Sequence, residues 1–158
     1  MLQLMLTPTV STVPPDTADL LARARRGDHA AFESLYRETV GAVYGLCLRM
    51  TADRGLAEDC VQQTYLQAWR KLHHFRGESA LATWLHRIAV NEVLGTFRRQ
   101  KRFDDAEPDE DIAAATTDNN ATVDLERAIA ALPDRARAVF VLVGVYGYPH
   151  DETAALLD

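Results

Sequence analysis

The stretch FRGESALATWLHRIAVNEVLGTFRRQKR, residues 75–102, predicts a loop followed by a long amphipathic helix. Its first four residues break helical periodicity, and Ser79 is well placed to cap a helix that continues to about Arg102. Along that helix, apolar residues recur at spacings of three and four, which places them on one side as core. These residues are Leu81, Leu85 and Ile88.

Another side of the same helix carries a polar stripe. The stripe consists of Thr83, Arg87, Asn91, Arg98 and Arg102, and Trp84 lies at its edge. Such a surface suits single-stranded or melted nucleic acid, because arginine holds phosphates, asparagine and threonine bond to base edges, and an indole stacks. The basic end Arg98-Arg99-Gln100-Lys101-Arg102 adds attraction that is independent of base sequence. Two plainer interpretations stay open: basic residues favour the C-terminus of a helix dipole, and a border tryptophan can be half-buried core.

Helical spacing continues along the rest of the chain and strand signals are poor, so we predict an all-α fold. A short first helix runs from Asp16 to a stop at Gly27, and Asp28 caps a longer second helix. A third helix runs from Asp53 to about residue 74, with Leu56, Cys60, Val61, Tyr65, Leu66, Trp69 and Leu72 in apolar register. Further helices are predicted over residues 122–132, 133–146 and 150–157, the second of which begins with Pro133.

The net charge of −6 hides an uneven distribution. Residues 1–103 hold fourteen Lys and Arg against ten Asp and Glu, a net of +4. Residues 104–126 hold nine acids and no base, and residues 127–158 hold three bases and four acids. The part of the chain before the acidic segment is therefore basic, so the bulk charge does not argue against a nucleic-acid partner.

Composition places the chain among globular proteins, with 47% hydrophobic and 25% charged residues, and the absence of a signal-peptide or membrane-span pattern predicts a cytosolic location. Residues 1–15 carry three prolines and no basic n-region, which indicates a disordered leader and not a signal peptide. No stretch is long and apolar enough to insert into a membrane. Cys47 and Cys60 fit neither a metal motif nor a disulfide framework, so we interpret them as small apolar fillers.

Four motifs together resemble a known family, the extracytoplasmic-function (ECF) sigma factors. FRGESALATWLHRIAVN, residues 75–91, is similar to the family's F-x-x-x-S-x-F-x-T-W-L-x-R-I-A-x-N, with Leu81 in place of a phenylalanine. AEDCVQQTYLQAW, residues 57–69, is similar to A-E-D-x-V-Q-E-T-F-x-x-A-W. DLLARARRGDHAAFESLY, residues 19–36, follows D-L-x-x-A-x-x-G-D-x-x-A-F-x-x-L-Y, and ERAIAALPDRARAVFVL, residues 126–142, resembles the start of the family's C-terminal domain.

The resemblance implies a domain plan. The disordered leader precedes a four-helix sigma region 2 domain over residues 16–103, and a flexible acidic linker follows over residues 104–121. In the family this linker runs through the RNA-exit path of polymerase, where an acidic strand can imitate RNA; an inert spacer is the alternative. Residues 122–158 form an incomplete helical sigma region 4 domain without the recognition helix that enters the major groove. Whether the chain is a fragment or a natural truncation stays open.

If the region 4 domain is incomplete, some of its apolar residues lack part of the helical surface that would normally pack against them. We therefore expect this surface to be mobile, to associate or to await a partner. The residues concerned are Val139, Phe140, Leu142, Val143, Tyr146, Leu156 and Leu157.

The resemblance also implies two binding surfaces. The helix over residues 57–72 would dock on the β′ clamp helices of RNA polymerase through Glu58, Asp59, Gln62, Gln63 and Gln67, with a solvated helix face as the alternative. The loop over residues 75–79 and the helix over residues 81–102 would open and read the non-template strand of the −10 element. The DNA-binding residues would be Phe75, Arg76, Ser79, Thr83, Trp84, Arg87, Asn91, Arg98, Arg99, Lys101 and Arg102.

These features predict an alternative sigma factor, not an enzyme, that directs RNA polymerase to promoters. The implied partners are core polymerase through its β′ and β subunits, promoter DNA and an anti-sigma factor. A truncated module that binds polymerase or an anti-sigma factor without initiating transcription is the alternative. We expect no cofactor and no metal, because His73, His74 and His86 form no convincing ligand pair with a carboxylate.

Overall fold

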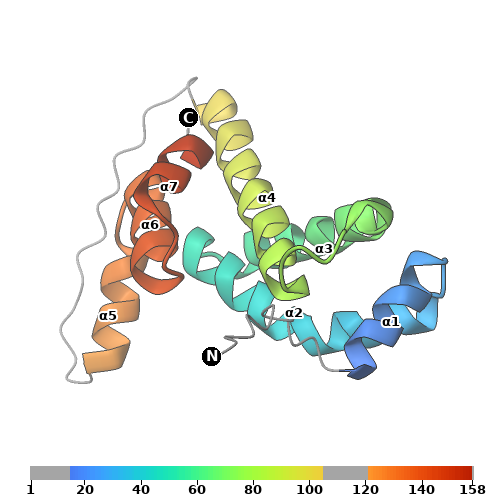
Figure 1. The fold of residues 1–158 in the computed structure, drawn as a ribbon. Coiled ribbons are helices and arrows are strands. Elements are labelled where there is room, and N and C mark those ends of the chain that lie inside the picture. Colours follow the sequence, from blue (N-terminus) through green and yellow to red (C-terminus); the bar gives the residue numbers. More distant parts are fainter. Residues whose placement is uncertain (1–14, 105–120, 158) are drawn as a thin grey trace, which may run out of the picture.

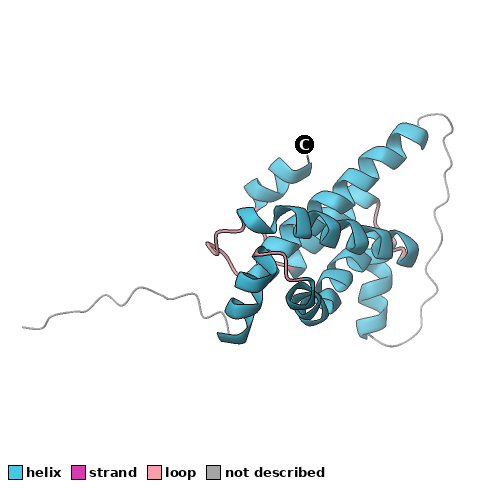
Figure 2. Ribbon diagram, turned by 90° about the vertical axis from the view of Figure 1, so that its right-hand side faces the viewer, coloured by secondary structure: helices cyan, strands magenta, loops and turns pink. Residues whose placement is uncertain are grey.

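The computed structural model describes residues 15–104 and 121–157, and within these ranges it contains helices and no strand (Figure 2). The elements are α1 (Pro15–Arg25), α2 (His29–Thr51), α3 (Arg54–Lys71), a 3₁₀ turn η1 (Leu72–His74), α4 (Leu81–Asp104), α5 (Ala121–Ala130), α6 (Asp134–Val139), a π-helical segment η2 (Phe140–Val145) and α7 (His150–Leu157). The all-α prediction is confirmed. The predicted leader up to residue 14 and the predicted linker over residues 105–120 lie outside the described residues.

Local hydrogen bonding sets the starts of α2 and α3, as the sequence predicts. Asp28 and Asp53 each accept a hydrogen bond from the amide three residues further on, at 3.1 and 2.8 Å. Each carboxylate thereby satisfies one of the amides that a helix start leaves without a partner. Gly27, between α1 and α2, has a φ of 94°, which glycine adopts without strain. α1 itself begins at Pro15, so Asp16 lies in its first turn and does not precede it.

Two further helix starts differ from the prediction by one or two residues. The Trp84 amide donates to the carbonyl of Ala80 at 3.1 Å, so Ala80, and not Ser79, immediately precedes α4. Pro133 precedes α6 with an extended ψ of 146°, and its carbonyl accepts from the Arg137 amide at 2.8 Å. A proline carbonyl can accept this first helical hydrogen bond, and its missing N–H is not needed at a helix start.

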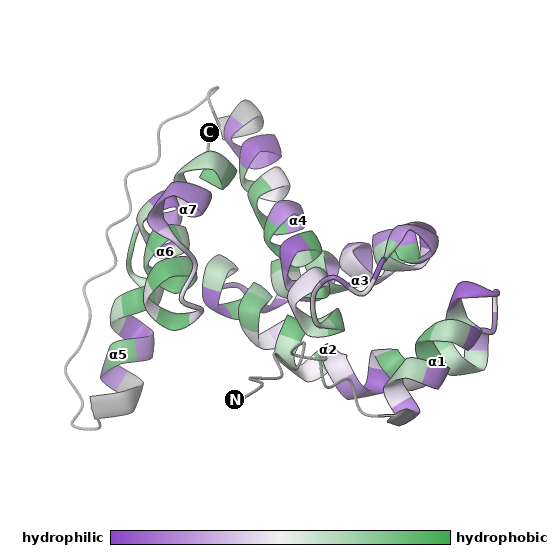
Figure 3. Ribbon diagram, in the orientation of Figure 1, coloured by the Kyte–Doolittle hydropathy of each residue, from purple (hydrophilic) through white to green (hydrophobic). Residues whose placement is uncertain are grey.

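The N-terminal half, residues 15–104, is built on mutual packing of α2, α3 and α4, with α1 against α2 (Figure 1). Their hydrophobic sides face inward (Figure 3). Leu81, Leu85 and Ile88 are buried, as their spacing predicts. Fully enclosed side chains of this half include Val43, Leu46, Cys47, Met50, Thr64, Val90 and Val93. Burial of one large aliphatic side chain contributes about 1.5–3 kcal/mol, so this core holds in place the helices that carry the candidate sites.

Both cysteines belong to this core, as predicted for apolar fillers. Cys47 has none of its surface exposed and Cys60 has 2%, and both are free thiols. Burial raises the pKa of Cys47 to about 12 and also raises the pKa of Cys60. Both thiols therefore stay protonated at neutral pH, which makes them poor nucleophiles.

The C-terminal half, residues 121–157, packs on the end of α2 and along α4 (Figure 1). Ala138, Val141 and Leu142 have no exposed surface and join the core of the N-terminal half. The expectation that Leu142 lacks cover is therefore wrong, because the two halves share one core. Val139 and Phe140 do remain open to solvent, with 37% and 41% of their surface exposed.

α6 continues directly into η2, a widened helical segment that the sequence does not predict. The Tyr146 amide donates to the carbonyl of Val141, five residues back, at 3.1 Å, which is the π-helical pattern. Gly147, with a φ of 68°, ends the segment at the predicted interruption. Tyr146 contacts Arg49 of α2 and His86 of α4, so this segment meets the N-terminal half directly.

Candidate nucleic-acid interface and polymerase surface

The loop before α4 and the first turns of α4 form a cavity of about 400 Å³ that is open to solvent, within the size range of ligand pockets. Its lining consists of His74, Phe75, Arg76, Glu78, Ser79, Trp84 and Arg87. Five of these are residues that the sequence predicts to bind DNA, so the fold brings them to one place. His74 and Glu78 were missed, although each is adjacent in sequence to a predicted residue.

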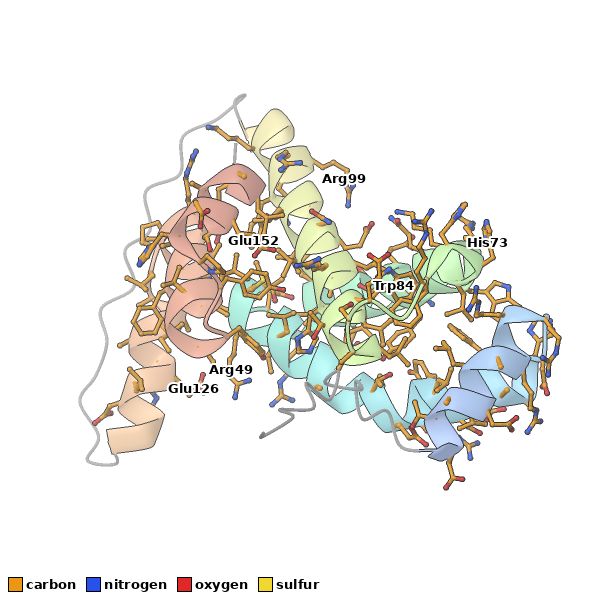
Figure 4. The ribbon with its side chains drawn as sticks, viewed as in Figure 1. Arg49, His73, Trp84, Arg99, Glu126 and Glu152 are labelled. Carbon is orange, nitrogen blue, oxygen red and sulfur yellow. The ribbon has the colours of Figure 1, made fainter. Side chains whose placement is uncertain are left out.

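Phe75 and Trp84 form the aromatic wall of this cavity. Their ring centroids are 5.1 Å apart and their planes meet at 48°, a separation typical of favourable aromatic pairs. Phe75 is 5% exposed, whereas Trp84 is only partly buried and lies at the start of α4 (Figure 4). Phe75 therefore supports the indole, and Trp84 offers a face on which a base can stack.

The polar stripe of α4 is exposed at Thr83, Arg87, Asn91 and Arg98, as predicted. However, α7 lies against part of it. Arg87 Nη2 is 3.4 Å from Glu152 Oε1. Arg98 Nη2 donates to the carbonyl of Leu156 at 3.1 Å. Two arginines of the stripe thus contact the C-terminal half, which the sequence did not predict.

The basic side chains at the C-terminal end of α4 point in more than one direction. Arg99 projects from α4 on the side away from α7 (Figure 4), and its Nη2 donates to Thr96 Oγ1 at 2.9 Å. Lys101 is exposed. Arg102 lies within α4, but its side chain is outside the described residues. α4 is continuous through Gly95 up to Asp104, so the predicted helix that carries these residues is present.

The face of α3 exposes four of the five predicted polymerase-binding residues, namely Glu58, Asp59, Gln62 and Gln63. Gln67 differs, because it is partly buried and its amide donates a short hydrogen bond to Glu92 Oε1 of α4. Gln67 therefore ties α3 to α4 and is less available to a partner than the other four residues.

An apolar groove of about 580 Å³ lies beside this face, between α2 and α3. Its lining includes Phe32, Tyr36, Val40, Tyr44, Glu58, Gln62, Tyr65, Leu66 and Trp69. The prediction that Leu66 is core is wrong, since it is 46% exposed. Residues 58, 62 and 66 follow one another at intervals of four and share one side of the helix. That spacing was the signal in the sequence that Leu66 lies on the polar face.

His86 lies where α4 meets the C-terminal half. Its ring is edge-on to Tyr146, with centroids 5.5 Å apart and planes at 87°. Its Nε2 is buried without a hydrogen-bond partner among the described residues, and burial lowers its pKa. The surrounding cavity is lined by Thr83, Arg87, Tyr146, Gly147, Tyr148, Pro149 and Glu152. Of these, Arg87 and Glu152 are charged and pair with each other, and neither bonds the imidazole Nε2.

Within residues 15–104 and 121–157, we searched for metal-binding clusters and for helices that could span a membrane. No group of three or more His, Cys, Asp or Glu side chains in these ranges could hold a metal ion. None of the helices there has the length and apolar character needed to cross a bilayer.

Comparison with known proteins assigns the family. Two family models match the chain, Sigma-70 region 2 over residues 35–103 and Sigma-70, region 4 over residues 122–158. The ECF RNA polymerase sigma factor SigM of Mycobacterium tuberculosis is 35% identical over 143 residues, which cover 89% of this chain and 72% of that protein. The ECF RNA polymerase sigma-E factor of Salmonella typhimurium is 31% identical over 159 residues, covering 88% and 81%. The chain therefore belongs to the ECF sigma factors of RNA polymerase, which act in transcription initiation.

Two solved structures share its fold. One is the sigma factor RpoE in complex with the anti-sigma factor NepR from Bartonella quintana, with a TM-score of 0.57 and 25% identity over 79% of this chain and 81% of that one. The other is an engineered region 2 of sigmaE in complex with GTAAAA, with a TM-score of 0.52 and 32% identity over 60% of this chain and 97% of that one.

Proposed function

We propose that this sigma factor binds core RNA polymerase through the exposed face of α3, and that it reads and opens the −10 element with α4 and the loop before it. The observation that carries the proposal is the cavity at the start of α4, where Phe75, Arg76, Ser79, Trp84 and Arg87 meet. The engineered region 2 of sigmaE that resembles the N-terminal half is in complex with GTAAAA, which supports the same role here.

In this proposal the cavity accepts one base of the non-template strand. Extruding a base from the stack costs a few kcal/mol. Stacking on an aromatic face such as Trp84 returns about 1–3 kcal/mol per base. Arg76, Glu78 and Ser79 then offer hydrogen-bonding groups around the base, and a wrong base costs about 1–3 kcal/mol. Because only an extruded base can be read, recognition and strand opening become one event.

The other partners follow from the same assignment. Glu58, Asp59, Gln62 and Gln63 are exposed side by side and form the proposed surface for the β′ clamp helices, and we assign the C-terminal half to the β subunit. An anti-sigma factor is a further proposed partner, by analogy with the RpoE–NepR complex. The protein acts as a specificity subunit without catalytic chemistry of its own.

The second candidate function is a module that binds polymerase or an anti-sigma factor without initiating transcription. The observation in its favour is that α7 contacts Arg87 and Arg98 on the proposed DNA-reading stripe. Promoter-specific run-off transcription with core polymerase separates the two candidates, because only the first one yields a transcript.

The proposed base pocket is tested by Trp84→Ala and Arg76→Ala, with Arg25→Ala on α1 as a matched control that removes the same charge from a residue outside the cavity lining. Binding to a labelled −10 non-template strand is measured by fluorescence anisotropy at one fixed salt concentration. Trp84→Ala should weaken binding by about 1–3 kcal/mol, because one base no longer stacks. Arg76→Ala should also weaken binding, whereas Arg25→Ala should not. If all three variants bind as tightly as the unmodified chain, the cavity is not the DNA site.

A further inference from the structure

A second cavity lies where the C-terminal part of α4, the start of α6 and the end of α7 meet. Its volume is about 350 Å³, it is open to solvent, and it falls within the size range of small-molecule pockets. The end of α7 lies beside the C-terminal part of α4 (Figure 1), where Arg98 donates to the carbonyl of Leu156 at 3.1 Å. This cavity shares no lining residue with the proposed base pocket, so it is a separate place on the molecule.

One wall of the cavity is apolar. Leu94 and Phe97 of α4 and Leu157 of α7 line it. Leu94 is 4% exposed, and the other two side chains are partly buried against the core. An aromatic ring between aliphatic side chains offers a surface on which a flat ring of a ligand can stack. The wall therefore favours an organic ligand over a bare inorganic ion.

The rim of the cavity is positively charged. Arg98 and Lys101 of α4 and Arg135 of α6 line it, and all three are exposed. Asp134 is the acidic residue of the lining, and its carboxylate pairs with Arg137, which offsets its charge. Cations that converge from two helices favour a ligand group with more than one negative charge, such as a diphosphate.

Gln100 adds a third kind of group to the lining. Within the described residues its amide has no hydrogen-bond partner, although the side chain is partly buried. A glutamine amide both donates and accepts, and it matches the N6 and N7 atoms of adenine in a paired contact. An acyl chain has no group for such an amide. The apolar wall, the amide and the cations together fit the three parts of a nucleotide.

We propose that the cavity at the junction of α4, α6 and α7 binds an adenine nucleotide. The base lies against Phe97, its edge meets Gln100, and the phosphates lie among the three cations. This site goes beyond the promoter role proposed for α4 and does not depend on it. Because the ligand contacts helices from both halves of the chain, its binding stabilises the folded protein.

The experiment is isothermal titration calorimetry of the full chain with ADP, at one fixed salt concentration and without DNA. Four other ligands isolate the parts of ADP. Pyrophosphate carries charge without a base, adenosine carries the base without phosphate, GDP has a different base, and decanoate is an anion with a flexible apolar chain. ADP should bind more tightly than all four, and it should raise the melting temperature of the chain at concentrations above its Kd.

Two substitutions at polar positions test the contacts. Gln100→Leu should weaken ADP binding by about 5- to 150-fold, the range for one paired base edge, and should make the affinities for ADP and GDP similar. Lys101→Ala should weaken ADP binding by up to about fivefold, as expected for one exposed ion pair. The matched control is Arg99→Ala, which removes one positive charge from a nearby residue that projects away from α7 and does not line the cavity (Figure 4). It should bind ADP like the unmodified chain.

The outcomes separate this site from the promoter role of α4. A Kd for ADP above about 1 mM would overturn the nucleotide site and leave the promoter role as it stands. Equal affinities for ADP and pyrophosphate would reduce the cavity to a patch of positive charge, and tighter binding of decanoate would assign it to acyl chains; either result overturns the proposal. Unchanged ADP binding by both Gln100→Leu and Lys101→Ala, in chains with native circular-dichroism spectra, would place the nucleotide elsewhere and overturn it as well. A failure to bind the −10 strand concerns only the promoter role.

Discussion

Replacement of Arg137 by alanine tests how the two halves are held together. The Arg137 guanidinium donates to the carbonyls of Met50, Ala130 and Leu132 at 2.8, 2.9 and 3.1 Å, and it pairs with Asp134. The first two carbonyls lie at the C-terminal ends of α2 and α5, where helix carbonyls lack amide partners. Arg137→Ala removes all four interactions at once.

The expected cost follows from this arrangement. Leaving a buried carbonyl without its donor costs about 1–3 kcal/mol, and the four interactions of one side chain are not added separately. That cost is a large share of the about 5–15 kcal/mol that stabilises a typical domain. Arg137→Lys keeps the charge but lacks the planar fork that reaches several acceptors. It should therefore destabilise the protein less than Arg137→Ala does.

The assay is urea unfolding followed by far-ultraviolet circular dichroism, with the free energy of unfolding taken at zero denaturant. Arg127→Ala, an exposed arginine on α5, is the matched control and should change stability by no more than about 0.5 kcal/mol. If Arg137→Ala proved as mild as Arg127→Ala, the guanidinium would not hold the two halves together.

Three further predictions concern α3, α4 and the interface of the halves. Asp59→Lys combined with Gln62→Arg should abolish pull-down by core polymerase without changing the melting temperature, since both residues are exposed; normal capture would exclude this face. Gly95→Ala should raise the free energy of unfolding by about 0.5–1 kcal/mol, because a Cβ there meets only a flexible arginine side chain at 3.5 Å; a lower urea midpoint would contradict this. Burial lowers the pKa of His86 from its ordinary 6.5, so the arrangement that buries His86 against Tyr146 disfavours the proton, and the packing of the C-terminal half on α4 should weaken as the pH falls below that value. Energy transfer between dyes on α1 and α5 measures this packing, and His86→Phe should remove its pH dependence; a response unchanged in that variant would assign it to another group.

Features that depend on nearby residues were predictable from the sequence. Asp28 and Asp53 cap the helices that follow them, because each carboxylate bonds an amide three residues further on. Leu81 and Leu85 are buried because helical spacing aligns them with a core-facing side. The residues of the pocket at the start of α4 could be predicted for the same reason, because they are close in sequence and come from one loop and the first turns of one helix.

Predictions were wrong where the buried side of a helix had to be chosen without knowing which helices pack against it. Leu66 has a hydrophobic side chain, yet it lies on the side of α3 that no other described helix covers closely enough to bury it. Gln67 was expected to face a partner, but Glu92 of α4 accepts its hydrogen bond. Helical periodicity defines which residues share a side, whereas packing decides which side is covered.

From the sequence alone, one could predict the α-helices, the caps at Asp28 and Asp53, the core of the N-terminal half and most residues that gather at the start of α4. Each of these depends on groups within a few residues of one another. The contact of Arg137 with the carbonyl of Met50, and those of α7 with Arg87 and Arg98, could not be predicted without the packing of the helices. These contacts join residues far apart in the chain, and nothing in the sequence distinguishes the carbonyls and guanidiniums that form them from those that do not. Their partners are set by how the two halves pack, because packing alone brings one particular acceptor within reach.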